Sequence, residues 1–87
     1  MKIKAGAYYR IKENWVGDRE ICICSKSTGK EVAILLDPIF VGIKRTVRGL
    51  YQFTWIQGGL TVYIPLRNAQ KIMKQIPRLK AELLYEA

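Results

Sequence analysis

The sequence predicts an α+β protein, in which a bent antiparallel β-sheet or small β-barrel of five to six strands is followed by a C-terminal amphipathic helix. As far as Pro65 the chain consists of short β-rich segments separated by turn signals. After Pro65 the hydrophobic period changes from two residues to about 3.6 residues. We expect a single domain over residues 1–87, with strands in residues 1–65 and the helix in residues 66–86.

Each expected strand ends at a turn or a proline. Residues 14–18 form a loop, and residues 27–30 form a hairpin loop that contains a glycine. Asp37 and Pro38 end the third strand, because proline cannot donate a hydrogen bond to a neighbouring strand. The expected strands are residues 7–12, 21–26, 31–36, 39–46, 50–57 and 60–64.

The last hairpin predicts which aromatic rings are buried. A two-residue turn at residues 58–59, both glycine, places Trp55 opposite Val62 and Phe53 opposite Ile64. The rings of the stretch YQFTW then share a face with aliphatic side chains. We therefore expect these rings to form the core under the helix, although rings close to basic residues are also typical of base-stacking surfaces.

The preceding hairpin extends this assignment to the neighbouring strand. A three-residue loop at residues 47–49, with Gly49 in the left-handed conformation, sets Ile43 beside Phe53. A loop shorter by one residue would press Lys44 against Phe53, and burying an unpaired lysine costs several kcal/mol. The opposite face should then be either solvent-exposed or the side of a second core. It would carry Phe40, Gly42, Lys44, Gln52, Thr54, Ile56, Thr61 and Tyr63.

The positive charge is concentrated in one half of the chain. Residues 1–37 hold seven basic and five acidic side chains, whereas residues 38–81 hold eight basic side chains and no acidic one. Such a block repels itself unless a polyanion or an acidic protein neutralises it. The net charge of +8 therefore indicates a negatively charged partner.

The C-terminal segment predicts a helix with one apolar and one basic face, interrupted by a bend or a break at Pro77. The apolar residues are small enough to pack on a sheet, whereas membrane-surface helices carry larger ones, so no membrane association is expected. The apolar face is Ala69, Ile72, Met73 and Ile76, continued by Leu79 and Leu83, and the basic ridge is Arg67, Lys71, Lys74 and Arg78.

Catalysis, metals and cofactors are not expected. The chain has no histidine for proton transfer near neutral pH. Its two cysteines, Cys22 and Cys24, cannot complete a four-ligand zinc site, and neither has a base to activate it. The first ten residues lack the apolar stretch of a signal peptide, so a cytoplasmic location is expected.

These patterns predict a non-enzymatic nucleic-acid-binding protein that mainly contacts the phosphate backbone, with single strands slightly favoured. The order of strands and helix resembles single-stranded-DNA-binding coactivator and Whirly-type folds, in element order alone. The alternative is a small protein-interaction or inhibitor module, of viral or plasmid type, that binds an acidic protein. A homodimer through an edge strand or the Phe40 to Tyr63 face is also open. The candidate binding residues are Lys44, Arg45, Arg48, Arg67, Lys71, Lys74 and Arg78, with Tyr63 and Phe40 to stack bases.

Overall fold

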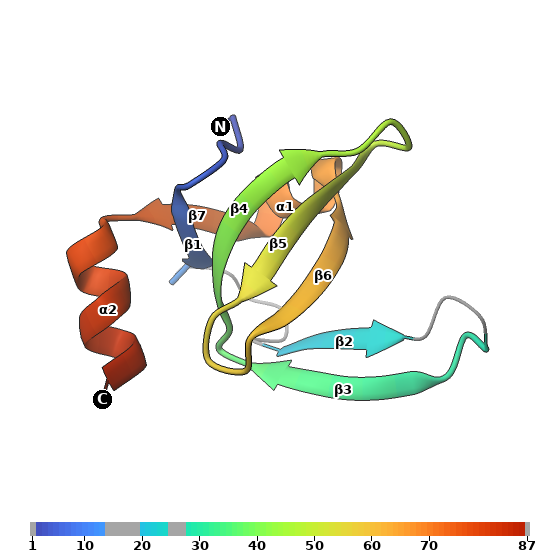
Figure 1. Cartoon of the computed structure of the whole chain (residues 1–87), viewed down its shortest axis with the longest axis horizontal. Helices are drawn as coiled ribbons and strands as arrows, with labels where there is room; N and C mark the ends of the chain where they lie inside the picture. Colours follow the sequence, from blue (N-terminus) through green and yellow to red (C-terminus); the bar gives the residue numbers. More distant parts are fainter. Residues whose placement is uncertain (1, 14–19, 25–27, 87) are drawn as a thin grey trace.

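The computed structural model describes residues 2–13, 20–24 and 28–86 (Figure 1). The loop predicted at residues 14–18 and the first residue of the loop predicted at 27–30 lie outside these ranges. The α+β class is confirmed: an antiparallel five-stranded sheet combines with a two-stranded sheet and two helices. The larger sheet is not closed on itself, so the bent-sheet form of the prediction applies.

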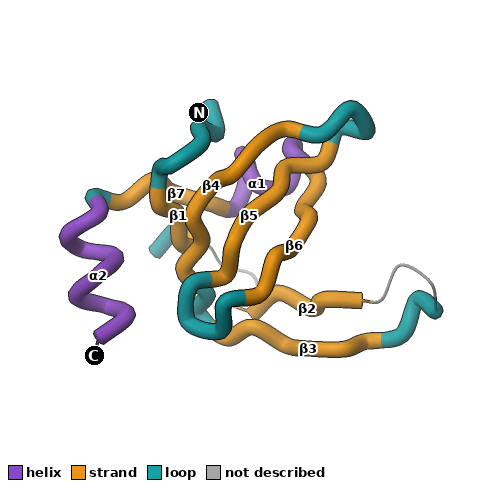
Figure 2. The backbone as a smooth tube through the Cα atoms, in the orientation of Figure 1, coloured by secondary structure: helices purple, strands orange, loops and turns teal. Residues whose placement is uncertain are grey.

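The main sheet has the strand order β6-β5-β4-β1-β7 (Figure 2). The β2–β3 hairpin forms the second sheet and extends to the lower right in Figure 1. One residue of this hairpin, Leu35, is buried in the core of the main sheet. The strands are β1 Tyr8–Ile11, β2 Glu20–Cys24, β3 Glu31–Leu36, β4 Ile39–Arg45, β5 Leu50–Trp55, β6 Leu60–Pro65 and β7 Met73–Ile76.

Residues 66–86 form two helices with a strand between them, α1 Leu66–Ile72 and α2 Arg78–Glu86, where a helix with a bend or a break at Pro77 was predicted. The interruption at Pro77 is present, but the chain has already left the helical conformation at Met73. Strand β7 pairs with β1 along its whole length. This pairing supplies backbone partners to the free edge of β1, whereas isolated short helices are marginal in water. Neither helix is long enough to cross a membrane.

The predicted register between β5 and β6 is wrong by two residues, because Trp55 lies opposite Leu60 and Phe53 lies opposite Val62. The shift is even, so every side chain keeps its predicted face. Gly58 is required because a Cβ atom there would collide with the ring of Trp55.

The β5–β6 loop, residues 56–59, is longer than the predicted two-residue turn and is held in place by a glutamine side chain. Gln57 Oε1 accepts a hydrogen bond from Ile39 N at 2.8 Å, and Gln57 Nε2 donates to Asp37 O at 3.3 Å. The β5–β6 loop is therefore tied to the start of β4, and this distant partner has no signal in the local turn sequence.

The three-residue loop between β4 and β5 is confirmed. Thr46 N donates to Leu50 O at 2.8 Å, and Gly49 has a φ of +76°. A β-bulge at Ile43 then shifts the pairing by one residue, so that Gly42 rather than Ile43 lies opposite Phe53. Because successive side chains alternate between faces, every residue of β4 before the bulge changes face relative to the prediction.

The bulge places Phe40 among the aromatic rings of the main core. The ring of Phe53 lies 5.5 Å from that of Phe40, 6.1 Å from that of Tyr9 and 5.1 Å from that of Tyr51, measured between centroids. We call this side of the sheet the core face. Ala69 of α1 packs against it.

The other side of the sheet, which we call the outer face, is covered at one corner by described residues of α2. There Ala81 of α2 packs on Ile39 and Ile76, with Tyr8 and Ile56 at the edge of the contact. The helix that was expected to cover one face thus contributes its first half to the core face and its second half to the outer face.

Residues 3–7, which we call the N-terminal strap, cross over Gly42. Gly6 N donates to Gly42 O at 2.8 Å, and Gly42 N donates to Ala7 O at 2.9 Å. A Cβ atom on Gly42 would lie 2.5 Å from the carbonyl oxygen of Lys4. The absence of a side chain on Gly42 therefore allows the backbone of the N-terminal strap to lie close to β4.

Candidate functional site

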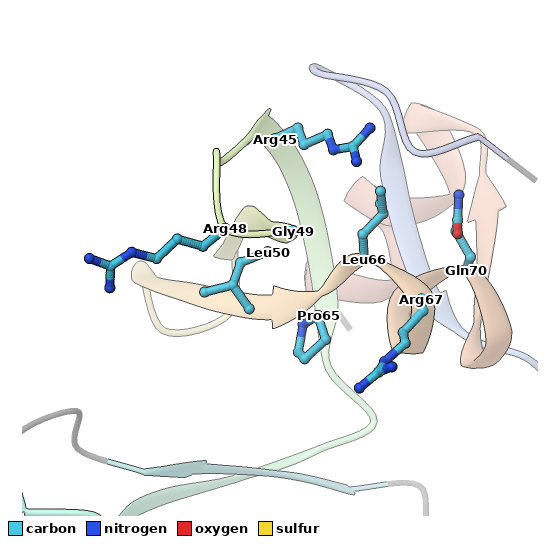
Figure 3. Close-up of a pocket in the computed structure, with 8 residues that line it drawn as sticks. All are labelled: Arg45, Arg48, Gly49, Leu50, Pro65, Leu66, Arg67 and Gln70. Atoms are coloured by element: carbon cyan, nitrogen blue, oxygen red, sulfur yellow. The ribbon is translucent and has the colours of Figure 1, made fainter.

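Three of the predicted cations lie around one hollow at the end of the main sheet (Figure 3). Arg45 comes from the end of β4, Arg48 from the β4–β5 loop and Arg67 from the first turn of α1. The hollow has a volume of about 510 Å³. Its other lining residues are Gly49, Leu50, Pro65, Leu66 and Gln70.

Backbone hydrogen bonds set the relative positions of these elements. Leu66 N, at the start of α1, donates to Gly49 O at 2.9 Å, which joins the hairpin loop to the helix. Within the loop, Thr46 Oγ1 accepts hydrogen bonds from Arg48 N at 3.3 Å and from Leu50 N at 3.2 Å. The loop and the helix therefore present their arginines from one connected backbone unit.

The three guanidinium groups surround an apolar floor and do not converge on one point. In Figure 3, Arg48 points away from the hollow on one side, while Arg45 and Arg67 lie on either side of Leu66. Within the part of the chain that the structure describes, no carboxylate lines this hollow. A compact anion needs convergent donors, whereas separated cations suit the regularly spaced charges of a polyanion.

The side chain opposite Arg45 does not compensate its charge. Tyr51 pairs with Arg45 across β4 and β5, and its ring is buried. Burial raises the pKa of the Tyr51 hydroxyl above its ordinary value, and the neighbouring Tyr9 raises it further. Tyr51 is therefore neutral at physiological pH.

A second predicted group lies on the outer face, next to the hollow. Lys44, Gln52 and Tyr63 form one row across β4, β5 and β6, and the Tyr63 side chain is 47% exposed. The adjacent row contains Leu50 opposite Pro65, which line the hollow. Rows on one face are about 7 Å apart, since each residue of a strand advances about 3.3 Å. The exposed ring and the hollow thus form a continuous surface.

Phe40 does not belong to that surface. Its side chain is fully buried against Phe53, so the prediction that Phe40 stacks bases beside Tyr63 is wrong. The bulge at Ile43 is the cause, because it turns Phe40 to the core face.

The predicted basic ridge does not exist as one line. Lys71 shares α1 with Arg67, but Lys74 lies on β7, directly opposite Arg10 of β1. Arg78 begins α2 and pairs with Glu82 at 2.9 Å, and this hydrogen bond raises the pKa of the Arg78 guanidinium. Only Arg67 of the four predicted ridge residues reaches the hollow.

Of two glutamines in this region, Gln70 was missed from the sequence and Gln52 was predicted on the outer face without a role of its own. Gln70 lines the hollow and follows Arg67 by three residues, a helical spacing that could have identified it. Gln52 lies between Lys44 and Tyr63, but the sequence predicted it only as one member of a mixed face.

Metal coordination finds no support in residues 2–13, 20–24 and 28–86, where no three His, Cys, Asp or Glu side chains gather. No protein-family model matches the chain, and neither a curated protein nor a solved structure is significantly similar to it. The residues around the hollow are therefore the basis for any statement about function.

Proposed function

We propose that this protein binds nucleic acid without catalysing a reaction, mainly through the phosphate backbone. The observation that carries the proposal is the grouping of Arg45, Arg48 and Arg67 around one hollow, from three separate elements. Arginine presents several N–H donors in a fixed plane and is well suited to phosphate oxygens. A folded chain that collects three such residues without a lining carboxylate fits a polyanionic partner.

A single strand fits this surface better than a duplex. The apolar floor of Leu50, Pro65 and Leu66 and the exposed ring of Tyr63 can contact unstacked bases. A duplex hides the faces of its bases in the helical stack, whereas a single strand exposes them to aromatic and apolar side chains. Lys44, in the same row as Tyr63, would neutralise a neighbouring phosphate.

The proposal is tested by fluorescence anisotropy with labelled single- and double-stranded oligonucleotides at several salt concentrations. If the three arginines and Lys44 each meet one phosphate of a single strand, log affinity should fall against log salt with a slope of about −3. The single strand should bind more tightly than the duplex at each salt concentration. Failure of both oligonucleotides to bind at low salt would rule the proposal out.

A charge-matched pair of variants tests the site. Replacing Arg45, Arg48 and Arg67 together by Gln should reduce the salt slope by about 2, since about 0.7 of the slope is lost for each contact. The control replaces Lys2, Lys30 and Lys80 by Gln, which removes the same charge from residues that do not line the hollow. An equal reduction in both variants would show that the hollow has no special role.

An acidic protein remains the second candidate partner, because cations around an apolar centre are also an arrangement found in protein interfaces. Val47, at the tip of the β4–β5 loop beside the hollow, is completely exposed, which fits such a contact. Recovery of one acidic protein on the immobilised chain after nuclease treatment, together with no oligonucleotide binding, would favour this candidate.

A further inference from the structure

Helix α2 exposes a stripe of leucines on its solvent side. Ala81 is its buried residue among those whose side chains are described, and it packs on the outer face of the sheet. Leu79 and Leu83 were expected to continue the packed apolar face, but they are 68% and 61% exposed. They are four residues apart, so they share one side of the helix, and each is two residues from Ala81, which puts that side opposite the sheet. An apolar stripe turned to solvent indicates a contact surface.

A second hollow, of about 210 Å³, lies between α2 and the β2–β3 hairpin. Leu84 of α2 and Leu36 of β3 line it, but so do the polar side chains of Arg10, Asp37 and Gln57. Leu84 is three residues from the buried Ala81, so it lies nearer the sheet side of α2 than Leu79 and Leu83 do. The hollow is therefore separate from the leucine stripe.

The charges of α2 are arranged unfavourably for a single helix. Its basic residues, Arg78 and Lys80, lie in the N-terminal half, and its acidic residues, Glu82 and Glu86, lie at the middle and at the C-terminal end, which is the reverse of what the helix dipole favours. The Arg78–Glu82 pair has the arginine first, which is the weaker order at this spacing, and both side chains are largely exposed. Lys80 has its own partner in Glu13, at 3.8 Å.

We infer that α2 is the contact surface for a second copy of this chain, docked through Leu79 and Leu83 as an antiparallel helix pair. The two-fold axis passes at the level of Ala81, on the opposite side of the helix from that residue. Leu79 then packs against Leu83 of the partner copy. Arg78 and Glu82 lie on the same edge of α2, and in a two-fold antiparallel pair equal edges meet. Arg78 therefore lies beside the partner's Glu82, and the two opposed dipoles make the charge order of each helix favourable.

The charges of α2 argue against a membrane or a nucleic acid as the partner of this surface. The helix sequence RLKAELLYE has two basic and two acidic residues. A membrane-surface helix usually carries an excess of lysine and arginine, and a nucleic-acid site would exclude the carboxylates. The self-complementary order of charges is the feature that selects a second copy.

The dimer should be weak. A nine-residue helix is about 14 Å long, so the buried area falls in the small class of interfaces that associate transiently. We expect a dissociation constant on the order of micromolar or above. Two arginine-lined hollows would then be carried by one assembly, but the inference does not depend on what the hollow binds.

Sedimentation equilibrium on nuclease-treated protein tests the apolar part. The wild-type chain should pass from monomer to dimer as its concentration rises, and a Leu79→Glu, Leu83→Glu variant should stay monomeric with an unchanged circular dichroism spectrum. The control, Val47→Glu with Leu60→Glu, also charges two exposed apolar residues and should dimerise like the wild type. A wild-type chain that stays monomeric at all concentrations, or that sediments with anionic vesicles as a monomer, would overturn the inference.

Mixing two charge variants tests the orientation. Arg78→Glu and Glu82→Arg should each weaken self-association, because like charges then meet on the shared edge. A one-to-one mixture should recover the wild-type dimer fraction, because the charges are again opposite between copies. A mixture no more associated than its components would contradict the antiparallel pairing, since loss of the pair within one helix cannot be repaired by mixing.

Discussion

The two faces of the main sheet are built from the same strands but have different surroundings. On the core face, α1, the N-terminal strap and Leu35 of β3 enclose a cluster of aromatic rings. On the outer face, α2 covers one corner, and the row containing Tyr63 stays exposed. The boundary between the two kinds of surface is set in β4, where one bulge residue, Ile43, decides which side chains point to which face. The alternation of side chains along a strand therefore assigns residues to the two faces of the sheet correctly only up to the first β-bulge.

The bulge has a steric reason in the core face. It places Gly42 rather than Ile43 opposite Phe53, beneath the N-terminal strap. A Cβ atom at Gly42 would already meet the carbonyl of Lys4 and the ring of Tyr51, so an isoleucine side chain has no room there. The strap and the bulge thus depend on each other.

Phe40→Ala should have the largest effect and tests whether Phe40 lies on the core face of the sheet or on the outer face. Because Phe40 is fully buried, we expect a loss of about 3–5 kcal/mol in the free energy of unfolding, as for Phe53→Ala. Urea denaturation followed by circular dichroism would measure both. If Phe40 were on the outer face, its replacement would change stability by no more than about 0.5 kcal/mol.

Gly42→Ala tests the strap. The added methyl group must displace the backbone of Lys4, so we expect a loss of about 1–3 kcal/mol. The amides of Gly6 and Gly42 should also exchange hydrogen faster, because their mutual pairing is disturbed. Unchanged stability together with unchanged exchange of both amides would argue against a tightly held strap.

Tyr63→Ala should have the smallest effect on stability, within about 0.5 kcal/mol, because the ring is nearly half exposed. Its effect should appear in the affinity for a single-stranded oligonucleotide, as a loss of about 1–3 kcal/mol for one stacked base. Thr61→Ala, which alters the next residue of β6 on the outer face, should leave both quantities unchanged. The opposite pattern, lost stability with intact binding, would show that Tyr63 belongs to a core.

The parts of the fold that were predictable depend on local sequence. Strand positions follow from alternation and turn residues, and the β4–β5 loop follows from Gly49. The concentration of positive charge that includes Arg45, Arg48 and Arg67 was predicted from the sequence. Their position around one hollow was not, because it depends on the hydrogen bond from Leu66 N to Gly49 O, which joins the β4–β5 loop to α1.

The parts that were not predictable depend on distant partners. Strand β7 has helical spacing in sequence and becomes a strand because β1 offers it an edge. The β5–β6 register depends on the bridge from Gln57 to the start of β4. The face on which Phe40 lies was mispredicted because the bulge depends on contacts with the strap, which lies far away in sequence.

The position of β1 between β4 and β7 has a consequence for the order in which the protein can fold. Of the strands in this sheet, β1 comes first in the sequence and lies in the interior of the sheet, and one of its two neighbours, β7, comes last. A growing chain that has not reached Met73 leaves one edge of β1 open to other strands, including those of neighbouring nascent chains. The sheet is therefore completed only once β7 has been made, and truncated chains that end before Met73 should aggregate even though their other strands are present.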